Sequence, residues 1–274
     1  MNIVRQQLIA ARYGDASQLA PAAWSPIIEH LLKHRSVRAY LPDPVSDEQL
    51  AAIVAAAQSA SSSSNLQAWS VIAVRDAARR AKLAELTGKQ PQVGEAPLQL
   101  VWIADLARLE RVTQITQRPG EALDYLEMFL VAAIDAAVAA QNAAVAAESL
   151  GLGIVYTGTM RNQPEEIAEL LGLPPKTIAL FGLCVGRPDP ARPADIKPRL
   201  PQSVVLHDEC YSLDAQTPGI ETYNAAMARF YEEQKMKVHA TWAVHSSKRV
   251  ANAGALSGRD RLTEALHARG FALK

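Results

Sequence analysis

The segment His34-Arg35-Ser36-Val37-Arg38 is the first candidate for chemistry in this sequence. In an extended chain side chains alternate, so His34, Ser36 and Arg38 project from one side and the other two residues from the opposite side. Two potential cations and a hydroxyl then share a face, and such charge-assisted donors suit a phosphate group. A basic turn exposed to solvent after a helix is the alternative interpretation.

A run of four serines, residues 61–64, is the second candidate. It lies between a predicted helix and a hydrophobic strand, where a flexible linker would have no two domains to connect. Small residues let a flat ligand approach the backbone, and serine hydroxyls can satisfy its polar edge. The run therefore fits either a ligand-facing loop or a flexible turn.

The glycines of residues 151–153 begin like a dinucleotide fingerprint, but Tyr156 stands where GxGxxG needs its third glycine. These glycines also precede a predicted strand, whereas the fingerprint follows one. A Rossmann site is therefore excluded. Gly158, between Thr157 and Thr159 at the end of that strand, still allows a ligand close to the backbone.

Lys197-Pro198-Arg199 lies in the proline-rich stretch 187–201. Proline restricts the backbone between the two bases, so both could reach one phosphate. Charges exposed on a surface loop are the alternative interpretation. The sequence contains no HExxH, GxSxG, GxxxxGK[ST] or paired-carboxylate motif.

Composition limits the classes of partner. The 274 residues include 28 Lys+Arg and 28 Asp+Glu, so the formal charge of zero provides no general attraction to nucleic acid or an anionic membrane. We therefore expect a small-molecule partner.

Cys184 and Cys210 lack a CxxC spacing, and we expect two buried, reduced thiols. The first residues do not read as a signal peptide, so the cytoplasm is the expected location.

The positioning elements follow from hydrophobic periodicity and capping signals. Strands are predicted at residues 69–74, 98–105, 153–159 and 178–186. Helices are predicted from the Ser46 cap, which has capping-box spacing to Gln49, over 77–87, and from Asn162 to Gly172. We expect residues 1–23 to form an N-terminal arm and residues 24–274 a single domain.

Residues 128–147 form a long apolar stretch that could be mistaken for a membrane span. Asp135, Gln141 and Asn142 interrupt it, and a carboxylate at a bilayer centre costs about 3 kcal/mol. We predict a helix buried all round, in the core or at a subunit interface. Asp135 should then lie beside a hydrogen-bond donor, because an unpaired buried carboxylate is costly.

Six segments, taken in order, resemble the nitroreductase family of FMN flavoproteins: HRSVRAYLPDPVSDEQL, SASSSSNLQ, LTGKQ, AAVAAESLGLGIVYTGTMRN, LFGLCVGRP and KPRLP. The specific likeness is to bacterial oxygen-insensitive NADPH nitroreductases and NAD(P)H:flavin oxidoreductases. The resemblance implies an α+β nitroreductase-like fold, with a central mixed β-sheet wrapped by helices. It also implies a homodimer that binds two FMN at the subunit interface.

The resemblance also assigns FMN contacts residue by residue. Basic and hydroxyl side chains are expected around the phosphate: His34, Arg35, Ser36, Lys197 and Arg199. Arg38 is expected at the pyrimidine end of the isoalloxazine, where a cation stabilises the reduced ring. The serine run, LTGKQ and the third strand supply the other ring contacts: Ser62, Ser63, Gln90, Tyr156, Thr157, Gly158 and Thr159. No side chain is assigned as catalytic and no metal is expected.

The activity implied by the resemblance is two-electron reduction of nitroaromatics, quinones or flavins by NADPH or NADH, with ping-pong hydride transfer through FMN. Two alternatives stay open. The chain could be a flavin reductase that supplies reduced FMN to another enzyme, or a flavin-binding protein without useful catalysis. The physiological acceptor does not follow from the sequence.

Two departures from the family pattern concern the substrates. Residues 232–241 carry Lys235, Lys237 and His239 where relatives carry arginines for the NADPH 2′-phosphate. Lysine binds phosphate as a point charge without a bidentate fork, so we expect a reduced preference for NADPH. Basic residues of the acceptor pocket fall on Asn252, Gly254 and Ala255, which predicts weak nitroaromatic turnover.

Overall fold

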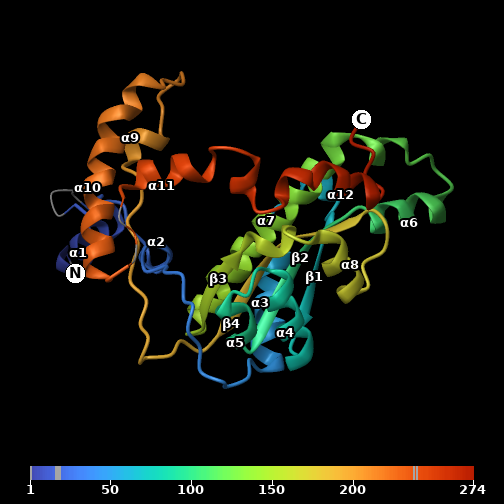
Figure 1. Ribbon diagram of the computed structural model, residues 1–274, viewed down its shortest axis with the longest axis horizontal. Coiled ribbons are helices and arrows are strands. Elements are labelled where there is room, and N and C mark those ends of the chain that lie inside the picture. The colour runs from blue at the N-terminus through green and yellow to red at the C-terminus, as the bar shows by residue number, and fades with distance from the viewer. Residues whose placement is uncertain (1, 16–19, 237, 239) are drawn as a thin grey trace. The chain divides into compact units, whose positions relative to one another are not determined.

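The computed structural model describes residues 2–15, 20–236, 238 and 240–274. The chain forms two units (Figure 1). Unit 1 comprises residues 1–35 and 194–256, and unit 2 comprises residues 36–193 and 257–274. The expected arm of residues 1–23 and single domain of residues 24–274 stay a prediction.

Unit 2 is built on a four-stranded sheet in the order β1-β2-β4-β3. The strands are β1 (Trp69–Val74), β2 (Leu98–Asp105), β3 (Gly153–Thr157) and β4 (Thr177–Gly186). The predicted strands are confirmed within a residue or two. The third ends at Thr157 rather than 159, because a 3-10 turn, η3 (Gly158–Arg161), begins there.

The expected mixed sheet is wrong, because every pair of neighbouring strands is antiparallel. Val74, the last residue of β1, pairs with Gln99 at the start of β2, so the connection between them returns to the sheet where it left. A parallel pair would need a connection that crosses the sheet. An isolated parallel bridge joins Ser36, outside the named strands, to Ile154 of β3.

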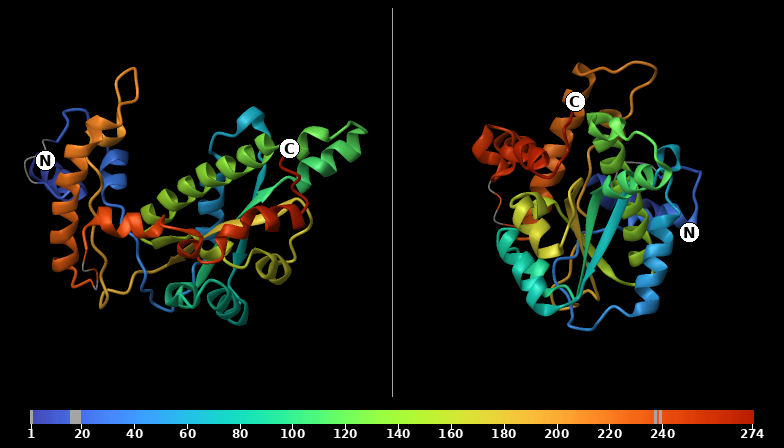
Figure 2. Two further views of the ribbon diagram at one scale, coloured as in Figure 1. Left: turned by 45° about the horizontal axis from the view of Figure 1, so that its top comes forward. Right: turned by 90° about the vertical axis from the view of Figure 1, so that its right-hand side faces the viewer.

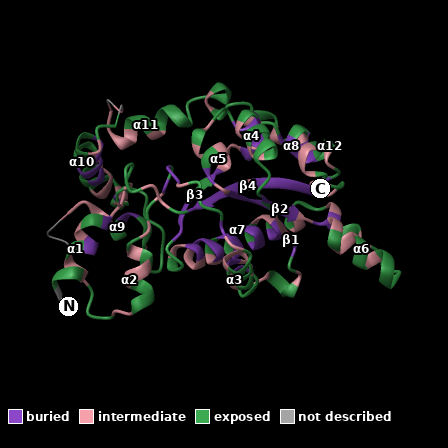
Figure 3. Cartoon of the chain, turned by 90° about the horizontal axis from the view of Figure 1, so that it is seen from below, coloured by how far each residue is buried: buried purple, intermediate pink, exposed green. Residues whose placement is uncertain are grey.

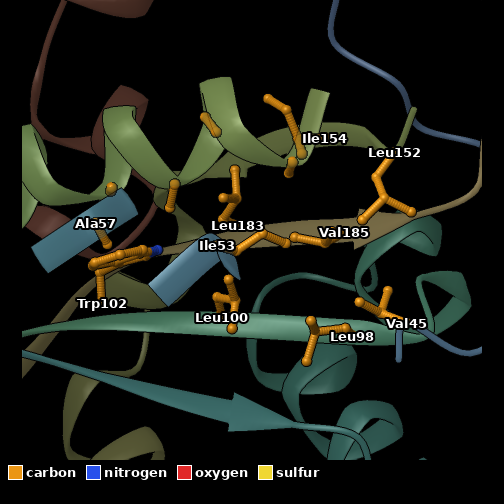
Figure 4. Packing of buried hydrophobic residues seen from close by; sticks show 14 of the residues in the cluster. Val45, Ile53, Ala57, Leu98, Leu100, Trp102, Leu152, Ile154, Leu183 and Val185 are labelled. Atoms are coloured by element: carbon orange, nitrogen blue, oxygen red, sulfur yellow. The ribbon is translucent and has the colours of Figure 1, made fainter. Parts of the chain in front are cut away.

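Helices cover both faces of this sheet, with α3 and α7 on one face and α4, α5 and α8 on the other (Figure 2). Their bounds are α3 (Asp47–Gln58), α4 (Ala77–Leu86), α5 (Pro91–Glu95), α6 (Ala107–Thr116), α7 (Leu126–Ser149), α8 (Pro164–Leu171) and α12 (Leu262–Ala268). The main core lies between α3, α7 and the sheet, where Ile53, Leu100, Trp102 and Leu183 pack against α7 alanines (Figure 4). Alanine allows these elements to approach closely.

Capping explains where two of the helices begin and end. The Ser46 hydroxyl accepts from the Gln49 backbone N–H, and the Gln49 side chain accepts from the Ser46 N–H, which confirms the capping box of α3. The expected Asn162 cap of α8 is wrong. Gln163 occupies that position without a side-chain hydrogen bond, and Pro164 fills the first helical position, where a backbone N–H would have no partner within the helix. Gly172 ends α8 in the left-handed conformation, as predicted.

Within unit 2, helix α7 is buried on one side only (Figure 3), so burial all round in the core of this unit is wrong, and burial at a subunit interface stays a prediction. Most of its alanines are buried against the core, whereas Leu130, Ile134 and Val138 are exposed at four-residue spacing. Ile134 is 60% exposed. By length and composition α7 could also cross a membrane, but within unit 2 it is a core helix. An apolar stripe along one face remains uncovered by the described residues of unit 2.

The two cysteines are free and differ in environment. Cys184 is buried in β4, and burial raises the pKa of its thiol to about 12. Cys210 is exposed, which corrects the expectation that both thiols are buried. It lies in the stretch of residues 206–213, where no hydrophobic period predicts a core position.

Unit 1 is helical. Its helices are α1 (Asn2–Tyr13), α2 (Pro26–Leu32), α9 (Gln202–Val205), α10 (Thr217–Glu233) and α11 (Trp242–Arg249), with 3-10 turns η4 (Asp214–Gln216) and η5 (Ala253–Leu256). Tyr223, Met227, Phe230 and Tyr231 of α10 form its core cluster. Helix α1 occupies the predicted arm, where Leu8, Ile9 and Arg12 are buried. It packs beside α10 (Figures 1 and 2).

Gly153→Ala should lower the free energy of unfolding by about 1 to 3 kcal/mol, because a Cβ there would lie 2.8 Å from Val37. The clash would displace the segment that follows Ser36. Gly94→Ala is the control, since its Cβ would meet only Ala84 at 3.6 Å and alanine favours a helix. Urea titration measures both. Equal stability of the two variants would contradict the close contact between Gly153 and Val37.

Candidate functional site

A buried carboxylate holds the serine loop. Asp135, on the core side of α7 and 3% exposed, accepts a hydrogen bond from the Ser62 hydroxyl at 2.7 Å. It also accepts from the backbone N–H groups of Ser63 at 3.2 Å and Ala68 at 3.1 Å. The expectation that Asp135 would lie beside a donor is confirmed. One side chain thus fixes both ends of residues 62–68.

The loop between these anchors has an unusual backbone. Ser64, Asn65 and Gln67 have φ angles of 48°, 56° and 50°, in the left-handed region. Each such non-glycine residue costs about 1 to 3 kcal/mol and persists only where its surroundings hold it. The Gln67 N–H donates to the Ser62 hydroxyl at 2.7 Å, which extends the hold of Asp135 across the loop. Because Ser63, Ser64 and Asn65 are exposed, the loop can present polar groups to a ligand.

The end of β3 offers hydroxyls without partners. The buried Oγ1 atoms of Thr157 and Thr159 have no hydrogen-bond partner among the described residues. Tyr156 packs edge-on against Phe181, with ring centroids 5.7 Å apart. A Cβ on Gly158 would lie 3.3 Å from a guanidinium nitrogen of Arg161. Unpartnered buried hydroxyls are uncommon, and a bound polar ligand can satisfy them.

The segment Ser36–Arg38 is extended, as predicted, beside the start of β3. The Val37 N–H donates to the Ile154 carbonyl at 2.9 Å. Val37 is buried, whereas Arg38 is exposed, so the polar face points away from the core. The Arg38 guanidinium lies 3.4 Å from the Ser36 carbonyl. Gln90 stands at the N-cap position of α5 without a side-chain bond to the helix backbone, and its side-chain oxygen accepts from the Gln92 side chain at 2.6 Å.

The remaining site residues, His34, Arg35, Lys197 and Arg199, belong to unit 1. Arg199 donates to the carbonyl of Lys197 at 3.2 Å, and the Lys197 ammonium lies 5.9 Å from the ring centre of Phe230. The Arg35 side chain is exposed and bonds the Lys33 carbonyl at 3.4 Å. Unit 1 therefore contains the basic set, and unit 2 contains the extended segment, the serine loop and the β3 end.

Arg12 is a residue that the sequence interpretation missed. Its guanidinium donates to the backbone carbonyls of His34 at 2.7 Å and Lys197 at 3.1 Å, so it joins two segments that the sequence keeps far apart. The signal that could have found it is the helical spacing of Leu8 and Arg12. Of the residues expected near the NADPH 2′-phosphate, Lys235 is described, and Lys237 and His239 lie outside the described residues.

The fold of unit 2 is α+β with an antiparallel sheet. Comparison of the sequence with known families identifies the family to which the chain belongs. A model of the nitroreductase family matches residues 31–187, and a model of that family's C-terminal domain matches residues 197–274. The chain belongs to the nitroreductase family.

Several relatives match along nearly their whole length. The chain is 37% identical to the NADPH-flavin oxidoreductase of Vibrio harveyi over 249 residues, covering 89% of this chain and 98% of the relative. It is 40% identical to the oxygen-insensitive NADPH nitroreductase of Salmonella typhimurium over 252 residues, 91% and 100% of the two chains. The structure of NfrA1 from B. megaterium superposes with a TM-score of 0.84 at 41% identity, covering 90% of this chain and all of the other.

Asp135→Asn should release the serine loop. An amide keeps one acceptor oxygen but places an NH2 against a backbone N–H of Ser63 or Ala68, and a buried donor without an acceptor costs about 1 to 3 kcal/mol. We expect that loss in the free energy of unfolding, measured with urea, and faster proteolysis within residues 62–68. Glu127→Gln, an exposed carboxylate on the same helix, is the control. Wild-type stability and proteolysis in Asp135→Asn would contradict the assigned role.

Proposed function

We propose that this chain is an FMN-dependent NAD(P)H oxidoreductase that reduces small acceptors such as nitroaromatics, quinones or flavins, and that it acts in the cytoplasm. The observation that carries the proposal is the match over 89% to 91% of the chain to an NADPH-flavin oxidoreductase and an NADPH nitroreductase. A further relative in structure is the V. harveyi NADPH:FMN oxidoreductase complexed with NAD+, with a TM-score of 0.80 at 35% identity.

The residues present suit FMN. We assign the phosphate to the basic and hydroxyl residues His34, Arg35, Ser36, Lys197 and Arg199. We assign the isoalloxazine to Arg38, Ser62, Ser63, Gln90, Tyr156, Thr157, Gly158 and Thr159. The unpartnered hydroxyls at the end of β3 support this assignment, because the polar edge of a flavin supplies donors and acceptors. The exposed serine loop, held by a buried carboxylate, supports it too.

Bound FMN would supply the redox chemistry, accepting a hydride from NAD(P)H and passing two electrons to an acceptor. The residues of the chain would bind FMN and orient its ring. A cation at Arg38 would stabilise negative charge that develops at the pyrimidine end of the ring. Serine and threonine hydroxyls would fix the polar edge of the ring by hydrogen bonds. No acid or base from the chain is assigned to the reaction.

Another relative favours a second candidate function, that of a flavin reductase. The chain is 38% identical, over 220 residues, to the FMN reductase (NADPH) of Bacillus subtilis. In such a role flavin itself is the acceptor, and reduced FMN leaves to serve another enzyme. Exchange of labelled FMN separates the two: a resident cofactor stays bound through many turnovers, whereas a flavin substrate exchanges in each one.

We also propose a homodimer. The exposed stripe of Leu130, Ile134 and Val138 on α7 is apolar, long and regular, and such stripes are covered in stable proteins. A second copy of the chain would cover it if the two α7 helices packed against each other. This assignment also explains why a helix with an alanine-rich core side carries leucine, isoleucine and valine on its other side.

We expect the purified protein to retain FMN, and Arg199→Glu or Lys197→Glu to weaken FMN binding by about 2 to 5 kcal/mol through loss of a charge-assisted contact with the phosphate. Arg79→Glu, which makes the same charge change on the exposed surface of α4, is the control. Fluorescence titration of apoprotein with FMN measures all three. A protein that takes up no FMN, or normal affinity in both site variants, would refute the proposed cofactor site.

Ile134→Asp should shift the protein from dimer to monomer, because the interface would bury an unpaired carboxylate. Ile115→Asp serves as control, since it makes the same change at an exposed isoleucine of α6 in the same unit. Light scattering at micromolar concentration reports the mass of each variant. A monomeric wild-type protein would contradict the dimer, and a dimeric Ile134→Asp would contradict the α7 interface.

The preference for NADPH over NADH should be modest, about tenfold in kcat/KM or about 1.4 kcal/mol, because lysines replace bidentate arginines. High salt should erode it, since exposed lysine contacts with phosphate are screened. Lys235→Ala and Lys237→Ala should each reduce the ratio, measured by steady-state kinetics at low and high ionic strength. Equal use of NADH at low salt would mean that no 2′-phosphate site exists there.

A further inference from the structure

The last turn of α1 places one buried guanidinium among backbone carbonyls. Arg12 is 8% exposed. One of its terminal nitrogens donates to the carbonyls of Leu32 at 2.8 Å and His34 at 2.7 Å, and the other donates to the carbonyl of Lys197 at 3.1 Å. The backbone N–H of Arg199 in turn donates to the Arg12 carbonyl at 2.7 Å. Arg12 therefore joins the His34 segment to the Lys197–Arg199 segment from both its side chain and its backbone.

Neighbouring contacts hold Arg12 in this place. Gly14 has a φ of +65°, and a Cβ there would lie 2.7 Å from the Cβ of Ala226 and 3.2 Å from the Cγ of Pro198. The Gly14 carbonyl accepts from Arg229 at 2.7 Å. The end of α1 is thus packed tightly against α10 and against the proline between the two bases. Little freedom remains for Arg12 to take another position.

Helix α1 precedes every residue that the family models match, because the first match begins at residue 31. The segments that Arg12 joins are nevertheless segments that the family models include or adjoin, at residues 34 and 197. Helix α1, which lies outside the matched region, therefore contacts the backbone of His34 and Lys197. This contact points to a role for α1 beyond covering apolar surface.

We propose that Arg12 is a positioning residue for the phosphate of FMN. The inference rests on the proposed function, which assigns His34, Lys197 and Arg199 to that phosphate. Arg12 bonds the backbone carbonyls of His34 and Lys197 in the contacts described above, and these bonds fix the spacing of the two segments. A donor set held at fixed spacing binds an anion more tightly than one that must be ordered on binding. Removing Arg12 should loosen the spacing and leave the phosphate ligands themselves in the chain.

The test compares FMN with riboflavin, which carries the same ring and lacks the phosphate. Both are titrated into apoprotein of the full chain by isothermal calorimetry. Arg12→Gln removes the guanidinium, and Arg12→Lys keeps the charge but offers one nitrogen where two now bond separate segments. Arg5→Gln is the control, because Arg5 lies on the same helix and stacks on Trp24, 5.3 Å from its ring centre. Thermal unfolding is recorded for every variant.

For Arg12→Gln we expect FMN affinity to fall about tenfold or more while riboflavin affinity changes less than about twofold. Arg12→Lys should show a smaller loss confined to FMN, and it tests the proposal if Arg12→Gln does not fold. Wild-type FMN affinity in a folded Arg12 variant would overturn the proposal. Equal weakening of both ligands would overturn it as well, because that result marks a general structural role.

Failure of the proposed function gives a different pattern. If the wild-type protein binds riboflavin as tightly as FMN, and Arg199→Glu leaves both affinities unchanged, there is no phosphate site for Arg12 to position. Arg12 would then be a structural residue of unit 1. If Arg199→Glu weakens FMN selectively and the Arg12 variants do not, the phosphate site stands and the positioning role alone is refuted.

Discussion

The hydrogen bonds accepted by the buried carboxylate of Asp135 are the constraint on which the proposed flavin-facing half of the site depends. They tie the loop of residues 62–68 to α7, and α7 is in turn packed by alanines against β2, β4 and α3. A loop with three left-handed non-glycine residues would relax if it were released. Desolvating a carboxylate is expensive, and its three donors offset that cost only while the loop keeps this conformation. The packed core thereby holds the exposed serines of the loop in one conformation.

Unit 1 uses a similar principle with the opposite charge. The Arg12 guanidinium bonds the carbonyls of Leu32, His34 and Lys197, as Asp135 bonds the N–H groups of its loop. In both places a buried charged side chain binds backbone groups and thereby fixes the spacing of the segments that carry the candidate site residues. Charge-assisted hydrogen bonds are stronger than neutral ones and favour one geometry. This arrangement suits a site that relies on positioning and electrostatics and leaves the redox chemistry to a cofactor.

Local features of this chain were predictable from sequence, and long-range ones were less so. The four strands and the Ser46 capping box depend on hydrophobic runs and three-residue spacings that can be seen in a short window. Strand direction depends on where each connection returns, so the antiparallel sheet was not predictable from the runs alone. Which face of α7 is buried within the chain was not predictable, because alanine and isoleucine look equally apolar in a window. Arg12 was missed because its role depends on residues 22 and 185 positions away.

Anaerobic stopped-flow spectroscopy tests the central claim, that this chain is a flavin-dependent NAD(P)H oxidoreductase, most directly. FMN-loaded protein is mixed with NADPH and then, in a second mix, with a flavin, a quinone or a nitroaromatic. The account predicts that the visible absorbance of the bound flavin bleaches at least as fast as steady-state turnover and returns when an acceptor is added. A flavin that stays oxidised in NADPH and NADH, or that bleaches more slowly than turnover, would contradict it.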